Sequence, residues 1–168
     1  VAKKAKAEGV RQFIFMSSMS VYGIEKGVIN YKTPLHPKSN YGKSKLQAEK
    51  LIRTLENNDF RIAILRPPMI YGKGCRGNYP RLSKLAVKLS FFPDIDNMRS
   101  MIYIDNLCEF IKLIIDNEES GLFFPQNSEY VKTSEMVRLI AKVHGKKIVL
   151  TNEKCCVNIL NVAQRRRK

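Results

Sequence analysis

Hydrophobic positions along the chain follow two kinds of pattern. Residues 12–17 and 60–65 are short, nearly continuous apolar runs, which are typical of parallel strands covered on both faces. Between them, residues 41–56 carry Ala48, Leu51, Ile52 and Leu55 at the i, i+3, i+4, i+7 spacing of an amphipathic helix. Strand, loop, helix and strand in this order predict a doubly wound parallel sheet of the α/β class.

The same patterns predict the remaining elements. Helices are expected at residues 2–8, closed by Gly9, and at 81–89, 106–115 and 133–144, with Asp105 as the N-cap of the third. Short strands are expected at 100–104, 121–124 and 147–150, loops at 18–38 and 71–80, and a turn around Pro93. Residues 1–150 are therefore assigned to one domain, and 151–168 form a tail to which the pattern assigns no element.

Composition narrows the class of protein. The chain has 168 residues, of which 44% are hydrophobic, enough for one globular core. It has neither an apolar run long enough to span a membrane nor a signal peptide at its start, so no membrane association is expected. The four cysteines form no Cys-x-x-Cys pair, which favours reduced thiols in a cytoplasmic protein. Neither His36 nor His144 resembles a metal ligand, and no metal is expected.

The formal net charge of +15 invites a nucleic-acid-binding interpretation. However, the lysines and arginines are spread along the chain among acidic residues, and the one dense cluster is at residues 165–168. No zinc-finger or RNA-recognition motif is present. A basic surface that serves anionic substrates, or solubility, explains the charge at least as well, so nucleic acid is not an expected partner.

Tyr41 and Lys45 are the first candidates for chemistry. A spacing of four places them one above the other on the same helix face. A nearby ammonium favours the phenolate form of a tyrosine, and such a phenol can act as a general acid and base. The pair taken alone is also compatible with a solvated first turn of a helix. A second match to the spacing, Tyr22 with Lys26, lies among glycines and is interpreted as a loop.

Two further segments lead to the same place. The first predicted strand runs into Ser17 and Ser18, and the second ends in an Arg-Pro-Pro segment at residues 66–68. Ligands of parallel sheets bind beyond the carboxyl ends of the strands. A hydroxyl pair, the Tyr41 helix and a proline-stiffened loop are therefore expected at one edge of the sheet.

With these residues noted, the chain resembles a known family. The segments SSMSVYG (17–23), YGKSK (41–45), LRPPMIYG (65–72) and RSMIYID (99–105) resemble the extended short-chain dehydrogenase/reductase family, and within it the NAD-dependent epimerase/dehydratases of nucleotide sugars. The resemblance implies a Rossmann-like sheet with a small carboxyl-terminal substrate-binding portion. It also implies NAD as cofactor, a nucleotide sugar as substrate, and a homodimer as the full-length protein.

The resemblance also implies roles for individual residues. Tyr41 would exchange a proton with a sugar hydroxyl, Lys45 would hold the nicotinamide ribose and favour the phenolate, and Ser18 would hydrogen-bond the reacting sugar oxygen. The residues that would line the cofactor are Ser17 and the backbone of Pro67, Pro68 and Met69.

Two residues are similar to the family's substrate-binding positions. Arg99 would grip the nucleotide diphosphate, for which a planar guanidinium is suited, and Asn78 would also touch it. Each candidate has a plainer alternative. Arg99 could be a solvated surface residue, and Ser17 and Ser18 could satisfy backbone groups at the end of a strand.

The residues at positions 19 and 20 separate reactions within the family. Dehydratases and decarboxylases place an acidic residue there, whereas this chain has Met19 and Ser20. This difference favours oxidation and re-reduction at one carbon, as in UDP-galactose 4-epimerase-like enzymes, which would serve polysaccharide synthesis.

The chain also departs from the family, because the Gly-x-x-Gly-x-x-Gly loop that seats the pyrophosphate is absent from the sequence. The chain thus resembles the back half of such an enzyme, and we expect low NAD affinity and an open, apolar sheet edge. Three hypotheses follow: an enzyme domain; a non-catalytic, NAD-responsive Rossmann-fold binding protein or inactive fragment; and a basic nucleic-acid-binding protein.

Overall fold

A computed structural model describes residues 1–24 and 27–151, and it forms two compact units. The first unit comprises Val1–Ile70 and Ile102–Gln126, and the second comprises Tyr71–Met101 together with the chain from Asn127 onward. Lys26 of the second Tyr/Lys match, and all of the predicted tail except Thr151, lie outside the described residues.

The first unit contains a parallel sheet of three strands, β1 (Gln12–Met16), β2 (Arg61–Leu65) and β6 (Gly121–Phe123), in the order β1-β2-β6. In register, Phe13 lies opposite Ile62, and Ala63 lies opposite Gly121. The predicted α/β class and the parallel sheet are thus confirmed. Among the described strands, none pairs with the outer edge of β1.

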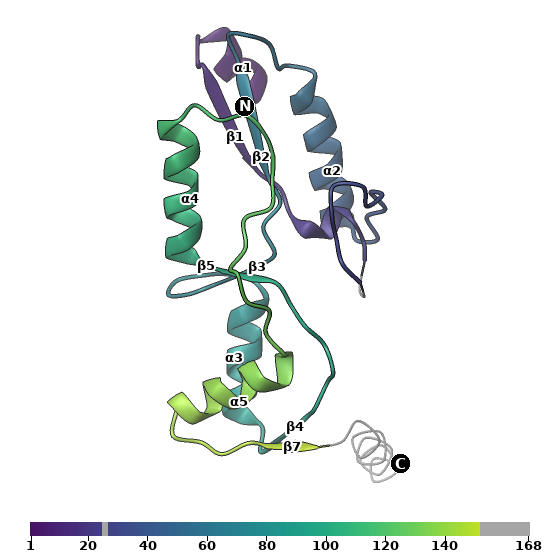
Figure 1. Cartoon of the computed structure of the whole chain (residues 1–168), viewed down its shortest axis with the longest axis vertical. Helices are drawn as coiled ribbons and strands as arrows, with labels where there is room; N and C mark the ends of the chain where they lie inside the picture. Colours follow the sequence, from purple (N-terminus) through teal and green to yellow (C-terminus); the bar gives the residue numbers. More distant parts are fainter. Residues whose placement is uncertain (25–26, 152–168) are drawn as a thin grey trace. The chain divides into compact units, whose positions relative to one another are not determined.

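Helices cover both faces of this sheet (Figure 1). The helix α4 (Ile104–Asp116) packs on one face, where Ala63 and Leu65 of β2 point. The helices α1 (Ala2–Ala7) and α2 (Asn40–Arg53) pack on the other, against Ile62 and Ile64. Successive side chains of a strand point to opposite faces, so the apolar run of β2 fills both halves of the core.

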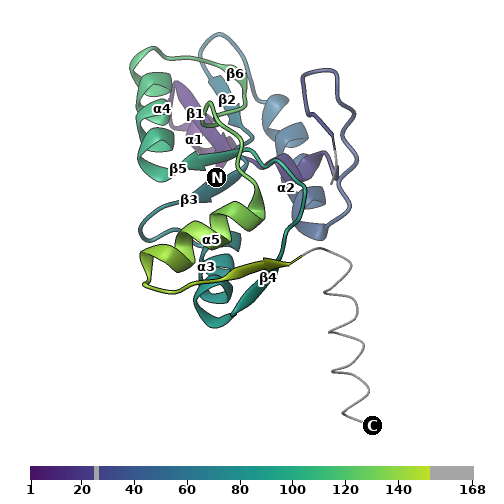
Figure 2. The ribbon, with the colours of Figure 1, turned by 60° about the horizontal axis from the view of Figure 1, so that its bottom comes forward.

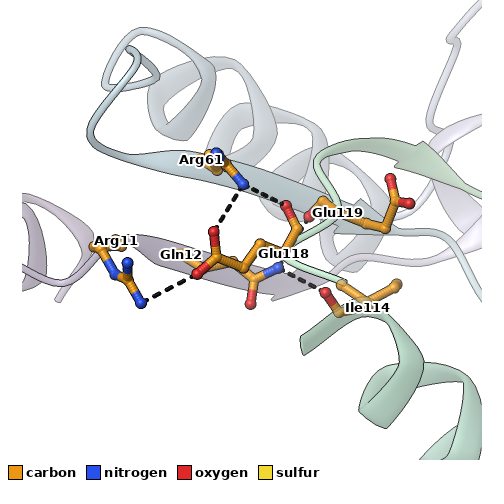
Figure 3. Close-up of polar contacts among 6 residues, drawn as sticks. All are labelled: Arg11, Gln12, Arg61, Ile114, Glu118 and Glu119. Carbon is orange, nitrogen blue, oxygen red and sulfur yellow. Dashed lines mark hydrogen bonds and ion pairs between the residues drawn. The ribbon is translucent and has the colours of Figure 1, made fainter. Parts of the chain in front are cut away.

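The amino ends of the strands are tied together by exposed polar contacts (Figure 3). The carboxylate of Glu118 pairs with Arg11 at 3.1 Å and with Arg61 at 2.9 Å. The side-chain amide of Gln12 donates to the backbone carbonyl of Ile114 within α4 at 2.9 Å and to that of Glu119 after α4 at 3.0 Å. Exposed ion pairs of this kind contribute little to stability. The carboxyl ends of the same strands lie at the opposite end of the sheet, where Ser17 and Ser18 follow β1 and the Pro-Pro segment follows β2.

The second unit pairs two short strands with two helices. The strands β4 (Phe91–Pro93) and β7 (Val149–Thr151) are parallel, and α3 (Asn78–Lys88) lies beside α5 (Thr133–Val143), as Figure 2 also shows. The side chain of Asn97 accepts a hydrogen bond at 3.0 Å from the backbone N–H of Thr133 at the start of α5. The strands β3 (Met69–Tyr71) and β5 (Met101–Tyr103) form a two-stranded sheet where the chain passes between the units.

Several predicted boundaries were wrong. The helix α3 begins at Asn78 rather than at residue 81, because Pro80 falls in its first turn, where no intrahelical N–H donor is needed. Asp105 lies in the first turn of α4 and not at its N-cap, which is Tyr103; a carboxylate there still opposes the helix dipole. The strands β3 and β4 were not predicted, because β3 directly follows the two prolines of the Pro-Pro segment and β4 ends in Pro93, where a turn was expected.

Within residues 1–24 and 27–151, no helix combines the length and apolarity needed to cross a membrane. In the same residues, no three His, Cys, Asp or Glu side chains are grouped so that they could hold a metal ion.

Candidate active site

Residues 17–22, here called the serine turn, follow β1 at the carboxyl edge of the sheet. The backbone N–H of Ser17 donates to the Leu65 carbonyl at 2.7 Å, and that of Met19 donates to the Pro67 carbonyl at 3.3 Å. These bonds hold the serine turn directly against the end of β2 and the start of the Pro-Pro segment. The sequence-predicted meeting of these two segments is therefore present in the structure.

Ser18 is the N-cap of the short 3₁₀ helix η1 (Met19–Val21). Its hydroxyl oxygen accepts from the backbone N–H of Ser20 at 3.2 Å and from the Ser20 hydroxyl at 2.9 Å. A serine hydroxyl has two acceptor positions and one donor. Because both acceptor positions are used within the turn, the remaining hydrogen-bonding capacity of the Ser18 hydroxyl is to donate its proton to another oxygen.

Tyr41 and Lys45 lie on α2, whose N-cap Ser39 accepts from the backbone N–H of Gly42 at 3.0 Å. The Lys45 ammonium donates to the Met16 carbonyl, the last residue of β1, at 2.8 Å. It also lies 5.7 Å from the centre of the Tyr41 ring. Tyr41 is 56% exposed, so the phenol is accessible to a ligand while its neighbouring ammonium is fixed to the sheet.

Gly42 brings α2 unusually close to the serine turn. A Cβ atom at this position would lie 2.5 Å from the Ser20 carbonyl oxygen and 3.1 Å from the Cβ of Pro37. Neither neighbour is the end of a flexible side chain, so only glycine permits this approach. The absence of a side chain next to Tyr41 thus sets the distance between α2 and the serine turn.

We predict that Gly42→Ala destabilises the chain, although alanine within a helix normally gains about 1 kcal/mol over glycine. The added methyl group must displace the backbone of the serine turn or of α2, and overpacking of this kind typically costs about 1–3 kcal/mol. Urea denaturation measures the change in the free energy of unfolding. Ser44→Ala, on an exposed position of the same helix, is the control and should be neutral or slightly stabilising; a stabilised Gly42→Ala chain would contradict the prediction.

A buried polar network lies beneath these residues, and sequence reasoning missed it. The carboxylate of Glu49 accepts from Arg66 Nε at 3.0 Å and from Arg66 Nη2 at 2.5 Å, and it also accepts from the Ser17 hydroxyl. Arg66 Nη1 donates to the Tyr22 hydroxyl at 2.7 Å. All four residues are at most 4% exposed.

The environment of Arg66 keeps it charged. Burial by itself lowers the pKa of a guanidinium, but the hydrogen bonds and negative charge of Glu49, together with Tyr22, outweigh burial and raise the Arg66 pKa above its ordinary value. The network is therefore an ion pair with every charged group hydrogen-bonded. Tyr22, the tyrosine of the second Tyr/Lys match, is a buried member of it.

The predicted cofactor residues differ in what their side chains do. The Ser17 hydroxyl donates to the Glu49 carboxylate in the buried network, so it is aimed neither at a ligand nor at a backbone group of the strand end. Pro67 is buried, and Pro68 and Met69 are half-buried, so this segment presents backbone and partial side-chain surface at the site.

Asn78 and Arg99 lie in the second unit, whereas the other predicted site residues lie in the first. Asn78 is the first residue of α3 and is exposed. Arg99 is also exposed, and its backbone exchanges two hydrogen bonds with that of Val131, at 2.9 and 3.0 Å.

Comparison with known proteins identifies the family. The model of the NAD dependent epimerase/dehydratase family matches residues 1–123. The chain belongs to this family. The match covers β1, α2 and β2 and thus every predicted catalytic residue.

Characterised relatives of this family member share its sequence over most of its length. A UDP-glucose 4-epimerase from Vibrio cholerae is 35% identical over 151 residues, which are 84% of this chain and 46% of the relative. An N-acetyl-alpha-D-glucosaminyl-diphospho-ditrans,octacis-undecaprenol 4-epimerase from Escherichia coli O157:H7 is 38% identical over 118 residues, 67% of this chain and 36% of the relative. The chain spans less than half the length of these two relatives.

Solved structures support the fold. The UDP-glucuronic acid 4-epimerase from Bacillus cereus in complex with NAD superposes with a TM-score of 0.77 at 23% identity, over 90% of this chain and 52% of that one. The UDP-Glc/GlcNAc 4-epimerase from Campylobacter jejuni gives a TM-score of 0.72 at 23% identity, over 90% and 54%. The predicted Rossmann-like fold is thereby confirmed, and the chain covers only about half of each of these structures.

The residues of this family member fit one end of an NAD molecule. Lys45 has three N–H donors, of which one is bonded to the Met16 carbonyl, so donors remain for ribose hydroxyls beside the exposed Tyr41. The glycine-rich loop for the pyrophosphate has no counterpart in the 168 residues. The donors of Lys45 and the exposed Tyr41 are thus compatible with the nicotinamide end of NAD, whereas the sequence has no glycine-rich loop for its pyrophosphate.

Proposed function

We propose that the chain is the catalytic part of an NAD-dependent nucleotide-sugar epimerase of the UDP-glucose 4-epimerase type. The observation that carries the proposal is the arrangement of Tyr41, Lys45 and the serine turn at the carboxyl edge of the sheet. There the Lys45 ammonium is bonded to the end of β1 and lies 5.7 Å from the Tyr41 ring.

In this proposal Tyr41 moves one proton. Its phenolate accepts the proton of the sugar hydroxyl as that carbon is oxidised to a ketone, and the phenol returns the proton to the same oxygen when the carbon is reduced. NAD, when bound, supplies the acceptor and then the donor of the hydride at this carbon. The net change at the sugar would be inversion of this one carbon, and NAD would not be consumed.

Lys45 and Ser18 support this transfer. The ammonium of Lys45 is bonded to the Met16 carbonyl and lies 5.7 Å from the Tyr41 ring, and its remaining donors would be offered to the ribose. Ser18 donates its free proton to the sugar oxygen, a function favoured by the two hydrogen bonds that its oxygen already accepts from Ser20. Ser20 thus has an orienting function that needs no carboxyl group.

The reaction is an epimerisation rather than a dehydration because Met19 and Ser20 cannot supply a further acid or base. Names of relatives are consistent with this, since those from Vibrio cholerae and Escherichia coli are both 4-epimerases. The substrate is a nucleotide diphosphate sugar, of which Arg99 and Asn78 would hold the diphosphate. The backbone of Pro67, Pro68 and Met69 would line the cofactor, and Ser17 would do so through its backbone.

We also propose a homodimer and a cytoplasmic location for the whole protein. The exposed Leu51 on α2, 63% accessible, leaves an apolar position on the helix that the family resemblance places at the dimer contact. The cysteine spacing, which has no Cys-x-x-Cys pair, supports the cytoplasmic location.

The test uses a completed protein, in which the amino-terminal part of the Vibrio cholerae relative precedes this chain. We expect the completed protein to bind NAD in calorimetry and to interconvert UDP-glucose and its 4-epimer. The chain alone should bind NAD weakly. The amino-terminal part alone, as the control, should convert nothing. NAD binding without conversion of any UDP-hexose would overturn the proposal in favour of a non-catalytic binding protein.

A further inference from the structure

The buried network joins three separate segments that meet at the site. Glu49 belongs to α2, one turn after Lys45. Ser17 begins the serine turn, and Arg66 directly precedes Pro67. Tyr22, bonded to Arg66, closes the other end of the serine turn. One carboxylate therefore contacts, directly or through one guanidinium, every segment that carries a proposed catalytic or cofactor residue in the first unit.

Stability alone is a poor explanation for such a group. Removing two charges from water is costly, and replacing a buried ion pair by apolar side chains of similar volume is often neutral or stabilising. Most of the apolar core of this unit is made by side chains of β2 and the helices on both faces of the sheet. Hydrogen-bonded charges differ from apolar side chains in that they fix the relative orientation of the groups they join, because their donors and acceptors permit few arrangements.

The geometry at each end of the network fits an orienting function. Glu49 Oε1 is shared by Ser17 and Arg66 Nε, so the first residue of the serine turn and the residue before the Pro-Pro segment are bonded to one atom. The neighbouring backbone bond from Met19 to the Pro67 carbonyl, at 3.3 Å, depends on the same two segments keeping their alignment.

We propose that Glu49 is a positioning residue of this site: through Ser17, Arg66 and Tyr22 it fixes the serine turn and the Pro67–Pro68 segment relative to the helix that carries Tyr41 and Lys45. The catalytic consequence rests on the proposed epimerase function. The positional part does not, and it can be measured without activity.

The test replaces the pair by apolar side chains of similar length, in the double variant Glu49→Met with Arg66→Met. The matched control makes the same substitutions in the exposed pair Glu118→Met with Arg61→Met (Figure 3), which lies at the other end of β2. Both double variants should remain folded, and urea denaturation verifies this for each.

Hydrogen exchange of this chain gives the first readout. In the buried-pair variant we expect the amides of Ser17 and Met19 to exchange at least about tenfold faster, while central amides of β2 are unchanged. The control should change neither set. Unchanged exchange at Ser17 and Met19 in a folded buried-pair variant would overturn the proposal.

Kinetics of the completed protein give the second readout. Misplacement of catalytic groups by about 1 Å can lower the rate roughly 10²-fold, so we expect a loss of this size in kcat with KM changed less than about threefold. A purely structural pair would instead regain full kcat once the double variant is folded, and that result would overturn the proposal. An inactive unsubstituted completed protein would refute the proposed function, while hydrogen exchange would still decide the position of the two segments.

Discussion

Tyr41→Phe in the completed protein is expected to lower kcat by roughly 10²–10⁴-fold, the usual contribution of a general acid and base. Phenylalanine keeps the aromatic ring near the Lys45 ammonium but lacks the oxygen that exchanges the proton. Because Tyr41 is 56% exposed, its hydroxyl adds little to folding, and the melting temperature should stay within a few degrees. Steady-state kinetics with UDP-glucose, together with a thermal melt, measure both quantities.

Tyr31→Phe is the matched control. Tyr31 is 75% exposed in the same unit, and its ring contacts that of Phe124 at 4.7 Å between centroids, a contact that phenylalanine preserves. This variant should keep kcat within about twofold. Equal rates for the Tyr41→Phe and Tyr31→Phe proteins would remove Tyr41 from the mechanism.

The largest effect on stability is expected for Arg66→Met alone. The substitution leaves the Glu49 carboxylate buried with one remaining partner, Ser17, and removes the donor to the Tyr22 hydroxyl. Breaking a buried ion pair by removing one partner costs about 3–5 kcal/mol. Urea denaturation of this chain should therefore show a large fall in the free energy of unfolding.

The partner substitution decides the cause of that loss. Adding Glu49→Met to Arg66→Met removes the unpaired charge, so most of the lost stability should return. A loss below about 1 kcal/mol for Arg66→Met alone would place this pair in the same class as exposed ion pairs and would contradict its burial. The two outcomes differ by several times the error of the measurement.

The sequence was sufficient for the elements with strong periodicity. The parallel strands β1 and β2 and the helix α2 were predicted because their apolar runs and helical spacing are long enough to separate the two periods. The meeting of the serine turn with the Pro-Pro segment was also predictable, because it follows from the polarity of a parallel sheet.

The buried network was not predicted, although a signal for it existed. Glu49 is four residues after Lys45 and three before Ile52, so it lies on the stripe of α2 that faces the sheet and not on a solvated face. Its partner Arg66 is 17 positions away in the chain. A contact of this kind depends on where two elements end in space, which local periodicity does not specify. The strands β3 and β4 likewise depend on pairing with distant segments, β5 and β7.

The segment from Arg66 to Pro68 has a consequence for ligand binding. Each proline ring fixes its own φ angle, and the residue before them is held by its bonds to Glu49 and Tyr22. Such a segment has little conformational entropy left to lose when a cofactor settles against it. Because this segment is already ordered in the folded chain, less conformational entropy is lost on binding. A larger part of the free energy of each contact with the cofactor therefore contributes to affinity.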